Sequence, residues 1–297
     1  MARLRLIAAA IAVVLVAVCP YASAAGAPLF PVTITAANGS VTLQQRPQRI
    51  VSLSATATED LFAIGAGSQV IAVDNQSNYP PQAPMTSLSA FHPNAEAIAA
   101  YKPDLVVVSG SSIVAPLERL GITVILDPAA KNLGEAYIQI SQLGAATGHP
   151  KKAATVVKSM QVGLTKLIRS VPNRSRHLKV FHELSPDLYS ATSSTFIGQV
   201  YKLFGFRNIA DDGDPTHSGY PKLSGEYVIA ANPDLVVLSD TQCCAQTAAT
   251  VAARPGWTNV NAVKRNGIIP VSDDIASRWG PRVVDFARLV AAVARRS

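Results

Sequence analysis

The chain has 297 residues, and 26 Lys and Arg against 19 Asp and Glu give a formal net charge of +7. The basic residues are spread thinly, with no Lys/Arg run longer than a pair, which speaks against a nucleic-acid-binding surface. The length is sufficient for two lobes, each with its own hydrophobic core.

The beginning of the chain has the pattern of a secretory signal peptide. A positively charged start precedes the apolar run Ile7–Val18, and small residues at 22–24 form a cleavage site. The apolar run is too short to span a bilayer as a helix. We therefore expect residues 1–24 to be removed and the mature chain to be exported to the periplasm or cell envelope. Cys19 leaves a second interpretation open, a lipoprotein anchored at that cysteine.

The first half of the mature chain alternates short apolar strands with short helices. The strands are apolar throughout, which is typical of a parallel sheet covered on both faces. Glu59 and Asp60 are expected in the first turn of a helix, where negative charges interact favourably with the helix dipole. The expected strands are 49–54, 70–73, 105–109 and 123–126, and the expected helices are 56–64, 94–100 and 115–120.

The middle of the chain is predicted to be helical. Residues 135–146 form one predicted helix, and Gly148-His149-Pro150 interrupts it. Residues 151–171 then carry apolar side chains at i, i+3 and i+4 spacing, which predicts a second helix of roughly 30 Å. We expect this long helix to join two lobes. The alternative is an ordinary crossover helix within one large sheet.

The second half repeats the alternation of the first. The predicted fold class is therefore α/β, with two Rossmann-like lobes at 25–133 and 173–297 and a helical linker at 134–172. The expected strands are 178–183, 235–239 and 268–271, and the expected helices are 196–204, 226–231 and 281–295.

One passage occurs twice. AEAIAAYKPDLVVVS at 95–109 returns as GEYVIAANPDLVVLS at 225–239. In each copy the proline ends a helix, the aspartate begins a turn, and the apolar run is a buried strand. A duplicated lobe accounts for this part. Each copy also opens with a glutamate, Glu96 or Glu226, which the fold does not require.

The sequence lacks the usual enzyme motifs. It contains no phosphate-binding loop and no G-x-S-x-G elbow, and Gly65-Ala66-Gly67 lacks the third glycine of a dinucleotide fingerprint. We therefore expect neither an enzyme nor a resident metal or cofactor. A site built from His92, His182 and a carboxylate, on an exported metal-dependent hydrolase, stays open as an alternative. Cys243 and Cys244 are adjacent and can form a strained ring or remain thiols.

Polar and aromatic residues gather where the predicted strands end. In open parallel sheets ligands bind beyond the carboxyl ends of the strands. The loops there carry hydroxyl groups, aromatic rings and one acid–base pair, Asp274 and Arg278. This composition predicts a binding surface for a large ligand that is partly apolar and partly polar.

A family resemblance supports the same interpretation. RIVSLSATATEDLFAIGAGSQVIAVDNQSNYP at 49–80, the two glutamate-led PDLVV passages and the long helix together resemble the exported substrate-binding proteins of ABC importers for vitamin B12 and ferric siderophores, most closely the members that bind vitamin B12. The resemblance covers about residues 49–294. It implies a class III periplasmic-binding-protein fold and a monomer that binds its ligand in a cleft between the lobes. It also implies delivery of that ligand to a membrane permease without chemistry.

The resemblance also implies roles for single residues. Tyr79, Phe91 and Tyr220 correspond to aromatic residues of the cleft, and Asp274 and Arg278 to contacts with the rim of the ligand. A corrin ring fits such a site, because it has apolar faces and a rim of amides. Ser109 stands where the B12-binding members have a tryptophan, and Phe91 and Tyr220 also replace tryptophans. We therefore expect a cobalamin-type corrinoid, with a ferric siderophore or haem as the alternatives.

Structural roles are open for several of these residues. Tyr79 could instead pack beneath the Pro80-Pro81 turn, and Arg278 could pair with a nearby carboxylate. Trp279 is assigned to packing. By resemblance, Glu96 and Glu226 dock to arginines of the permease. The alternative for both is a helix-start carboxylate favoured by the dipole.

Overall fold

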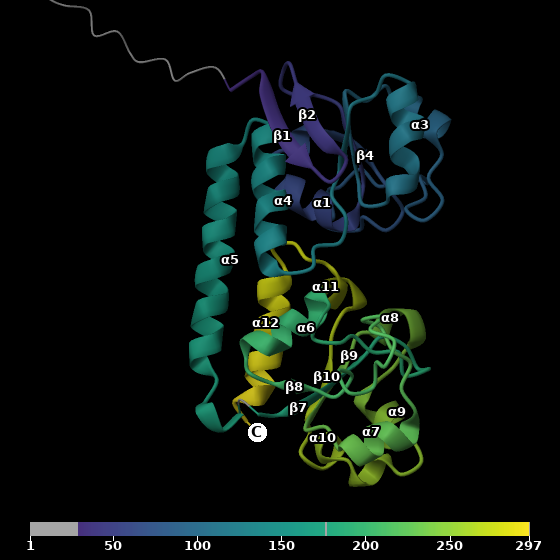
Figure 1. The fold of residues 1–297 in the computed structure, drawn as a ribbon, viewed down its shortest axis with the longest axis vertical. Coiled ribbons are helices and arrows are strands. Elements are labelled where there is room, and N and C mark those ends of the chain that lie inside the picture. Colours follow the sequence, from purple (N-terminus) through teal and green to yellow (C-terminus); the bar gives the residue numbers. More distant parts are fainter. Residues whose placement is uncertain (1–28, 176, 297) are drawn as a thin grey trace, which may run out of the picture.

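The computed structural model describes residues 29–175 and 177–296 (Figure 1). The predicted signal peptide and Cys19 lie outside these residues. Two α/β lobes stand one above the other, and a long helix runs beside both (Figure 1). None of the helices in the described ranges is both long and apolar enough to cross a bilayer.

The N-terminal lobe is built on a four-stranded parallel sheet with the order β4-β3-β5-β6. Every residue of β3, β5 and β6 is buried, which explains why these strands have no polar alternation. The strands are β3 (Ile50–Leu53), β4 (Val70–Val73), β5 (Leu105–Val108) and β6 (Val124–Leu126), and the helices between them are α1 (Ala55–Ala63), α2 (Ala95–Ala99) and α3 (Val114–Arg119).

The C-terminal lobe has a second parallel sheet with the order β10-β9-β7-β8. The two sheets are separate, so one large sheet with a crossover helix is excluded and the two-lobe prediction is confirmed. The two-residue strand β8 has no counterpart among the predicted strands. The strands are β7 (Lys179–Glu183), β8 (Arg207–Asn208), β9 (Leu235–Leu238) and β10 (Ile268–Pro270), and the helices are α6 (Phe196–Leu203), α7 (Gly225–Ala231), α8 (Thr241–Cys244), α9 (Ala248–Ala252), α10 (Asn261–Lys264), α11 (Asp273–Ser277) and α12 (Val283–Ala294). Short 3₁₀ turns lie at Gly67–Gln69, Ser111–Ile113, Asn173–Ser175 and Trp257–Asn259.

The aspartate of each PDLVV passage has the same structural task in both lobes. Asp104 accepts hydrogen bonds from the backbone N–H groups of Gln48 (2.7 Å) and Arg49 (3.0 Å), just before β3 begins. Asp234 accepts one from the backbone N–H of Lys179 (3.0 Å), the first residue of β7. Each aspartate therefore ties its own strand to the start of the neighbouring strand, which accounts for this part of the repeat.

A hairpin precedes the first lobe and was not predicted. β1 (Val32–Ala36) and β2 (Gly39–Leu43) are antiparallel, with alternate residues buried. Gly39 has φ +106°, a conformation that favours glycine in the tight turn between the strands. The apolar sides of both strands join the main hydrophobic core, and β1 packs against α4 (Leu133–Ala146).

The long predicted helix is α5 (Pro150–Ser170), with 21 residues. Its inner face buries Ala153, Met160 and Leu164, and it packs against both α4 and α12. Because α4 lies on the N-terminal lobe and α12 belongs to the C-terminal lobe, α5 connects the two (Figure 1).

The position of Glu59 and Asp60 differs from the prediction. Helix α1 begins at Ala55 with Ser54 as its N-cap, so the two acids are its fifth and sixth residues and not part of its first turn. Both are buried. The Ser54 hydroxyl caps the helix by accepting a hydrogen bond from the backbone N–H of Ala57. Glu59 has no part in capping this helix.

Candidate functional site

The carboxyl edges of the two sheets are joined by direct hydrogen bonds. The Asn78 side chain, on the loop after β4, donates to Asp274 Oδ2 of α11 at 2.8 Å. Arg278 donates to the Gln76 carbonyl and to Asn78 Oδ1, both at 2.9 Å. Asp274 and Arg278 follow β10, so the loops that follow one edge strand of each sheet are in contact. We call the loops at these two carboxyl edges the interlobe face.

Glu59 lies at the centre of a group of ion pairs between the lobes. Its side chain is 2% exposed and accepts hydrogen bonds from Arg278 (2.7 Å) and from Arg282 Nε (2.8 Å). Arg278 also pairs with Asp274 at 2.7 Å. We call Glu59, Asp274, Arg278 and Arg282 the interlobe ion cluster. Two guanidinium groups satisfy one buried carboxylate, so the removal of Glu59 takes a buried partner from both arginines at once.

Arg278 is therefore placed differently from a free cleft residue. It is 6% exposed, and its guanidinium donates to four protein acceptors, three of them in the N-terminal lobe. The structural alternative, pairing with a carboxylate, is present in this structure. Contact with a ligand stays a prediction for Arg278. Asp274 is more accessible, with 26% of its side chain exposed, and it stays a candidate for the rim of the ligand.

Tyr79 borders the interlobe ion cluster. The Arg282 guanidinium lies over its ring at 4.1 Å from the centroid, a cation–π contact. Tyr79 also lines a cavity of about 250 Å³ together with Glu59, Phe62, Pro80 and Arg282, among others. Tyr79 as a whole residue is still 41% exposed, so it remains accessible to a ligand beside Arg282.

Phe91 and Ser109 lie at the carboxyl edge of the N-terminal sheet. The backbone N–H of Ala90 donates a hydrogen bond to the side-chain oxygen of Asn75, which lies just after β4. The loop that bears Phe91 therefore folds back to the end of that strand. Phe91 is 76% exposed, an unusual position for a large apolar ring. Ser109 follows β5 directly and is half-buried.

Tyr220 has the corresponding position in the C-terminal lobe. The backbone N–H of Ser190 bonds to the Pro221 carbonyl, and that of Thr192 bonds to the Gly219 carbonyl, both at 2.9 Å. These bonds hold the segment around Tyr220 beside the loop that follows β7. Tyr220 is 51% exposed. The structure thus places aromatic side chains at the carboxyl edges of both sheets.

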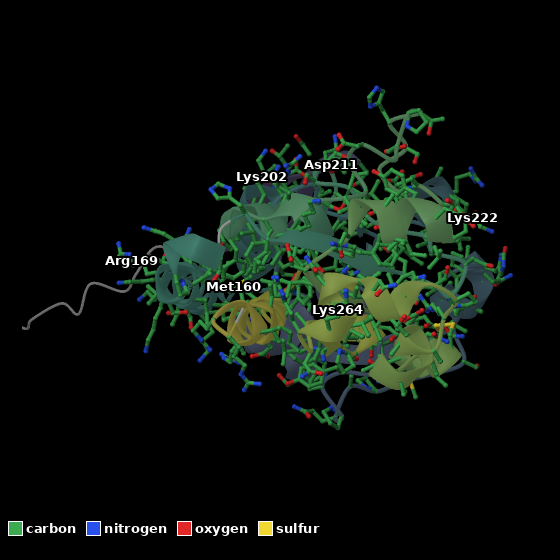
Figure 2. All side chains as sticks on the ribbon, turned by 90° about the horizontal axis from the view of Figure 1, so that it is seen from below. Met160, Arg169, Lys202, Asp211, Lys222 and Lys264 are labelled. Atoms are coloured by element: carbon green, nitrogen blue, oxygen red, sulfur yellow. A yellow bond between two sulfur atoms is a disulfide. The ribbon has the colours of Figure 1, made fainter. Side chains whose placement is uncertain are left out.

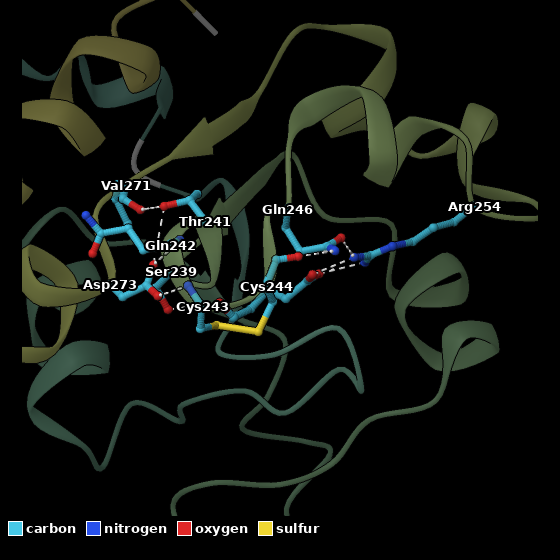
Figure 3. The surroundings of a disulfide bond; sticks show 10 residues. Ser239, Thr241, Gln242, Cys243, Cys244, Gln246, Arg254, Val271 and Asp273 are labelled. Carbon is cyan, nitrogen blue, oxygen red and sulfur yellow. Dashed lines mark hydrogen bonds and ion pairs between the residues drawn. A yellow bond between two sulfur atoms is a disulfide. The ribbon is translucent and has the colours of Figure 1, made fainter.

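The single-turn helix α8, which follows β9, carries a disulfide between the adjacent Cys243 and Cys244 (Figure 3). Asp273 holds this turn, because its carboxylate accepts hydrogen bonds from the backbone N–H groups of Gln242 (3.2 Å) and Cys243 (3.0 Å). Asp273 immediately precedes Asp274 of the interlobe ion cluster. The residue that holds the disulfide-bearing turn, Asp273, is therefore the sequence neighbour of Asp274, which contacts the N-terminal lobe.

A buried acidic pair lies beneath that turn. Glu183, at the end of β7, is fully buried and forms a bidentate ion pair with Arg254, whose guanidinium lies 4.8 Å from the Trp257 ring centroid. Burial raises the pKa of Asp240 to about 7, and the neighbouring Glu183 carboxylate raises it too. Arg254 therefore compensates the buried charge of Glu183, whereas neither carboxylate oxygen of Asp240 has a hydrogen-bond partner among the described residues.

The candidate metal site is not assembled. His182 is fully buried in the C-terminal lobe, where it bonds to the hydroxyl groups of Tyr201 and Ser239, whereas His92 is exposed. Burial lowers the pKa of His182 to about 3. In the described part of the chain, no three His, Cys, Asp or Glu side chains come close enough together to hold a metal ion.

The two repeated glutamates occupy equivalent places. Glu96 and Glu226 are the second residues of α2 and α7, and both side chains are exposed. Each helix is capped by a side chain two residues earlier, Asn94 or Ser224. Neither helix therefore depends on its glutamate as a cap, and docking to a permease stays a prediction for both residues.

Trp279 packs as expected. Its ring joins the main hydrophobic core, and its indole N–H donates to Gln139 of α4 at 2.8 Å. Sequence reasoning missed Glu59, Asn78 and Arg282. The signal in the sequence was the acidic pair Glu59-Asp60 in the middle of a helix that lies between two buried strands.

The comparisons with known proteins agree with this architecture. The sequence profile of the periplasmic binding protein family matches residues 50–274. An uncharacterized ABC transporter substrate-binding lipoprotein of Bacillus subtilis is 32% identical over 269 residues, covering 86% of this chain and 83% of the relative. A cobalamin-binding protein of Halobacterium salinarum is 31% identical over 267 residues, covering 86% of this chain and 72% of the relative.

Solved structures have the same fold. The periplasmic haem-binding protein HutB of Vibrio cholerae superposes with a TM-score of 0.73 at 22% identity, covering 82% of this chain and 98% of that one. At this identity the likeness shows the fold alone. The matched profile and the relatives at 32% and 31% identity show that this chain belongs to the periplasmic binding protein family.

Proposed function

We propose that this protein captures a cobalamin-type corrinoid at the interlobe face and delivers it to the permease of an ABC importer. The observation that carries the proposal is the set of exposed aromatic rings at the two carboxyl edges, namely Tyr79, Phe91 and Tyr220. In open parallel sheets ligands bind beyond the carboxyl ends of the strands, which is where these exposed rings lie.

The chemistry of a corrinoid matches the residues there. Its apolar ring faces suit the aromatic side chains, and its amide rim suits carboxylates and amides such as Asp274 and Asn78. The H. salinarum relative, named a cobalamin-binding protein, supports the same ligand class. The B. subtilis relative, named an ABC transporter substrate-binding lipoprotein, supports export and a membrane permease as the partner.

A ferric siderophore or haem is the second candidate. The observation that favours it is the presence of the exposed groups His92, Tyr189 and Tyr220 at or near the interlobe face, because His and Tyr are axial ligands of haem iron. These side chains are also compatible with a corrinoid, for which they would supply packing and hydrogen bonds.

A ligand panel separates the candidates. The mature chain, starting near Ala25, is titrated with cyanocobalamin, haemin and several ferric siderophores by isothermal calorimetry. We expect cyanocobalamin to bind one-to-one and saturably, with no turnover. Saturation by a siderophore or by haemin, with no heat from cyanocobalamin, would replace the corrinoid by that ligand while leaving the binding function intact.

A further inference from the structure

The charged residues on the outer face of α5 are all basic. Helix α5 contains no acidic residue, and the sequence has no Asp or Glu between Glu135 and Glu183. All of its basic side chains are exposed, and none forms an ion pair within the described residues. We call this surface the basic stripe; it consists of Lys151, Lys152, Lys158, Lys166 and Arg169.

The stripe lies on one side of the helix. At about 100° per residue, its five members fall within roughly a third of the circumference, opposite the buried Ala153, Met160 and Leu164. Figure 2 shows Arg169 at the outer edge of the molecule and Met160 on the inner side. Figure 1 shows α5 as the outermost helix, with α4 and α12 on its inner side only. The 21 residues of α5 therefore present a straight charged rod of about 30 Å.

The elements packed against α5 do not neutralise the stripe. The only acid of α4 is Glu135, which bonds to the Lys131 N–H and to Asn132 at the start of its own helix. The only acid of α12 is Asp285, which pairs with Arg288. Residues 136–182 hold eight Lys and Arg, which exceeds the net charge of +7 of the whole chain. Five of these eight residues are the members of the stripe.

We propose that the basic stripe binds the anionic phospholipid surface of a membrane. A straight row of unpaired lysines is complementary in charge to a flat anionic layer, and each such residue near the surface strengthens binding roughly fivefold. The stripe carries no aromatic residue, and Val162, 59% exposed, is its one large exposed apolar side chain. Binding is therefore electrostatic and superficial, without insertion of the helix.

Such binding leaves the ligand site accessible. The interlobe face belongs to the loops of the two lobes, which lie to the right of α5 in Figure 1, whereas the stripe is on the side of α5 opposite its buried residues. In this arrangement the protein stays concentrated at the membrane and still exchanges ligand. This inference depends on the charge pattern of α5 and not on the identity of the ligand.

Flotation with lipid vesicles tests the proposal. The mature chain, starting near Ala25 and without any lipid anchor, is mixed with vesicles of phosphatidylglycerol and phosphatidylcholine in equal parts, and with vesicles of phosphatidylcholine alone. We expect binding to the first vesicles only, and its loss in about 1 M salt, where the screening length falls to about 3 Å.

A charge-matched pair of variants assigns the effect to the stripe. The stripe variant replaces Lys151, Lys158, Lys166 and Arg169 by Gln and should weaken vesicle binding by about a hundredfold or more. The control replaces four exposed basic residues outside the stripe and should change it by less than about fivefold. Circular dichroism melting verifies that both variants are folded. The control residues are Arg119, Lys131, Lys202 and Lys264, of which Figure 2 shows Lys202 and Lys264 away from α5.

Three results would overturn the proposal. The wild type fails to float with phosphatidylglycerol vesicles at low salt, the two variants lose binding equally, or soluble polyglutamate binds the stripe while vesicles do not. The last result would assign the stripe to an acidic protein partner. None of these results bears on ligand binding, so the proposed function is tested separately.

Discussion

Glu59 and Arg278 are 219 residues apart in the sequence and form an ion pair of 2.7 Å that joins the two lobes. Both side chains are buried. A second arginine, Arg282, binds the same carboxylate and also covers part of the Tyr79 ring. The contact between the lobes and one of the exposed aromatic residues are therefore held by the same cluster.

Loss of the Glu59 charge should destabilise the protein strongly. In Glu59→Gln, Arg282 loses its buried carboxylate and Arg278 keeps only its pair with Asp274, and removal of one member of a buried pair costs about 3 to 5 kcal/mol. The free energy of unfolding is measured by urea denaturation. The matched control is Asp285→Asn, which breaks an exposed pair with Arg288 and should cost about 1 kcal/mol or less. Equal losses in the two variants would contradict the importance of the interlobe ion cluster.

The role of Arg278 can be separated from that of Glu59. If Arg278 serves only to join the lobes, Arg278→Gln lowers the stability about as much as Glu59→Gln does, and the double variant costs little more than either single one. The ligand affinity of the folded fraction then changes equally in both single variants. A much larger loss of affinity in Arg278→Gln than in Glu59→Gln would show direct contact with the ligand.

Asp127 should make the protein less stable as the pH rises. Burial raises the pKa of Asp127 from 3.8 to about 7, so between these values the folded state binds more protons than the unfolded state. The contribution of this group to the free energy of unfolding is fully present below about pH 4. It falls as the pH rises to about 7, by at most about 1.4 kcal/mol per pH unit.

Denaturation at several pH values tests this sign. In Asp127→Asn the titrating group is absent, so the fall in stability between pH 5 and pH 8 should be smaller than in the wild type. His182 has the opposite effect, because burial lowers its pKa to about 3. Its contribution makes the free energy of unfolding rise with pH up to about pH 6.5. An unchanged pH profile in Asp127→Asn would contradict the assignment.

Cys243 and Cys244 should have no free thiol in the exported protein. They are the only cysteines after residue 24, and the structure joins them in a disulfide. A thiol assay under denaturing conditions should detect no thiol before reduction and two per chain after treatment with a phosphine. The Cys243→Ser/Cys244→Ser variant serves as the blank. Two thiols in the untreated protein, purified from an oxidising compartment, would show that the pair is reduced.

Glu96 and Glu226 should matter for transport and not for ligand capture. Both are exposed at the starts of α2 and α7, which are capped by other residues, so charge reversal to Lys should leave the fold intact. If these glutamates dock to basic residues of the permease, the double reversal abolishes uptake in cells and leaves the calorimetric ligand affinity unchanged. The control is Glu118→Lys, an exposed glutamate elsewhere on the N-terminal lobe. Normal uptake by the double variant would assign both residues to the helix dipole.

Local patterns were sufficient to predict much of the fold. The apolar runs at β3, β5 and β9 and the spacing in α5 are written in consecutive residues, and burial on both sheet faces or on one helix face is their direct result. The two-residue β8 is too short to leave such a pattern. The hairpin β1–β2 did leave one, since VTITA and GSVTL are buried at alternate positions.

The contact between the lobes could not be predicted in the same way. A glutamate at 59 is compatible with an exposed helix start or with a buried ion pair, and only the arrival of Arg278 and Arg282 from the far end of the chain decides between them. The aromatic residues at 79, 91 and 220 were singled out through the family resemblance. The structure adds that they are exposed at the carboxyl edges of the sheets, while their contact with a ligand stays a prediction.

The central claim is that a corrinoid binds at the interlobe face, and cyanocobalamin calorimetry with Phe91→Ala tests it most directly. Phe91 is 76% exposed, so its truncation should leave the fold intact while removing an aromatic contact worth about 1 to 3 kcal/mol, or roughly five- to 150-fold in affinity. The control is Leu120→Ala, another exposed apolar residue, at the end of α3. The account predicts tight binding by the wild type and by the Leu120 variant, and clearly weaker binding by the Phe91 variant. Equal affinity in all three proteins, or no binding of cyanocobalamin by the wild type, would contradict it.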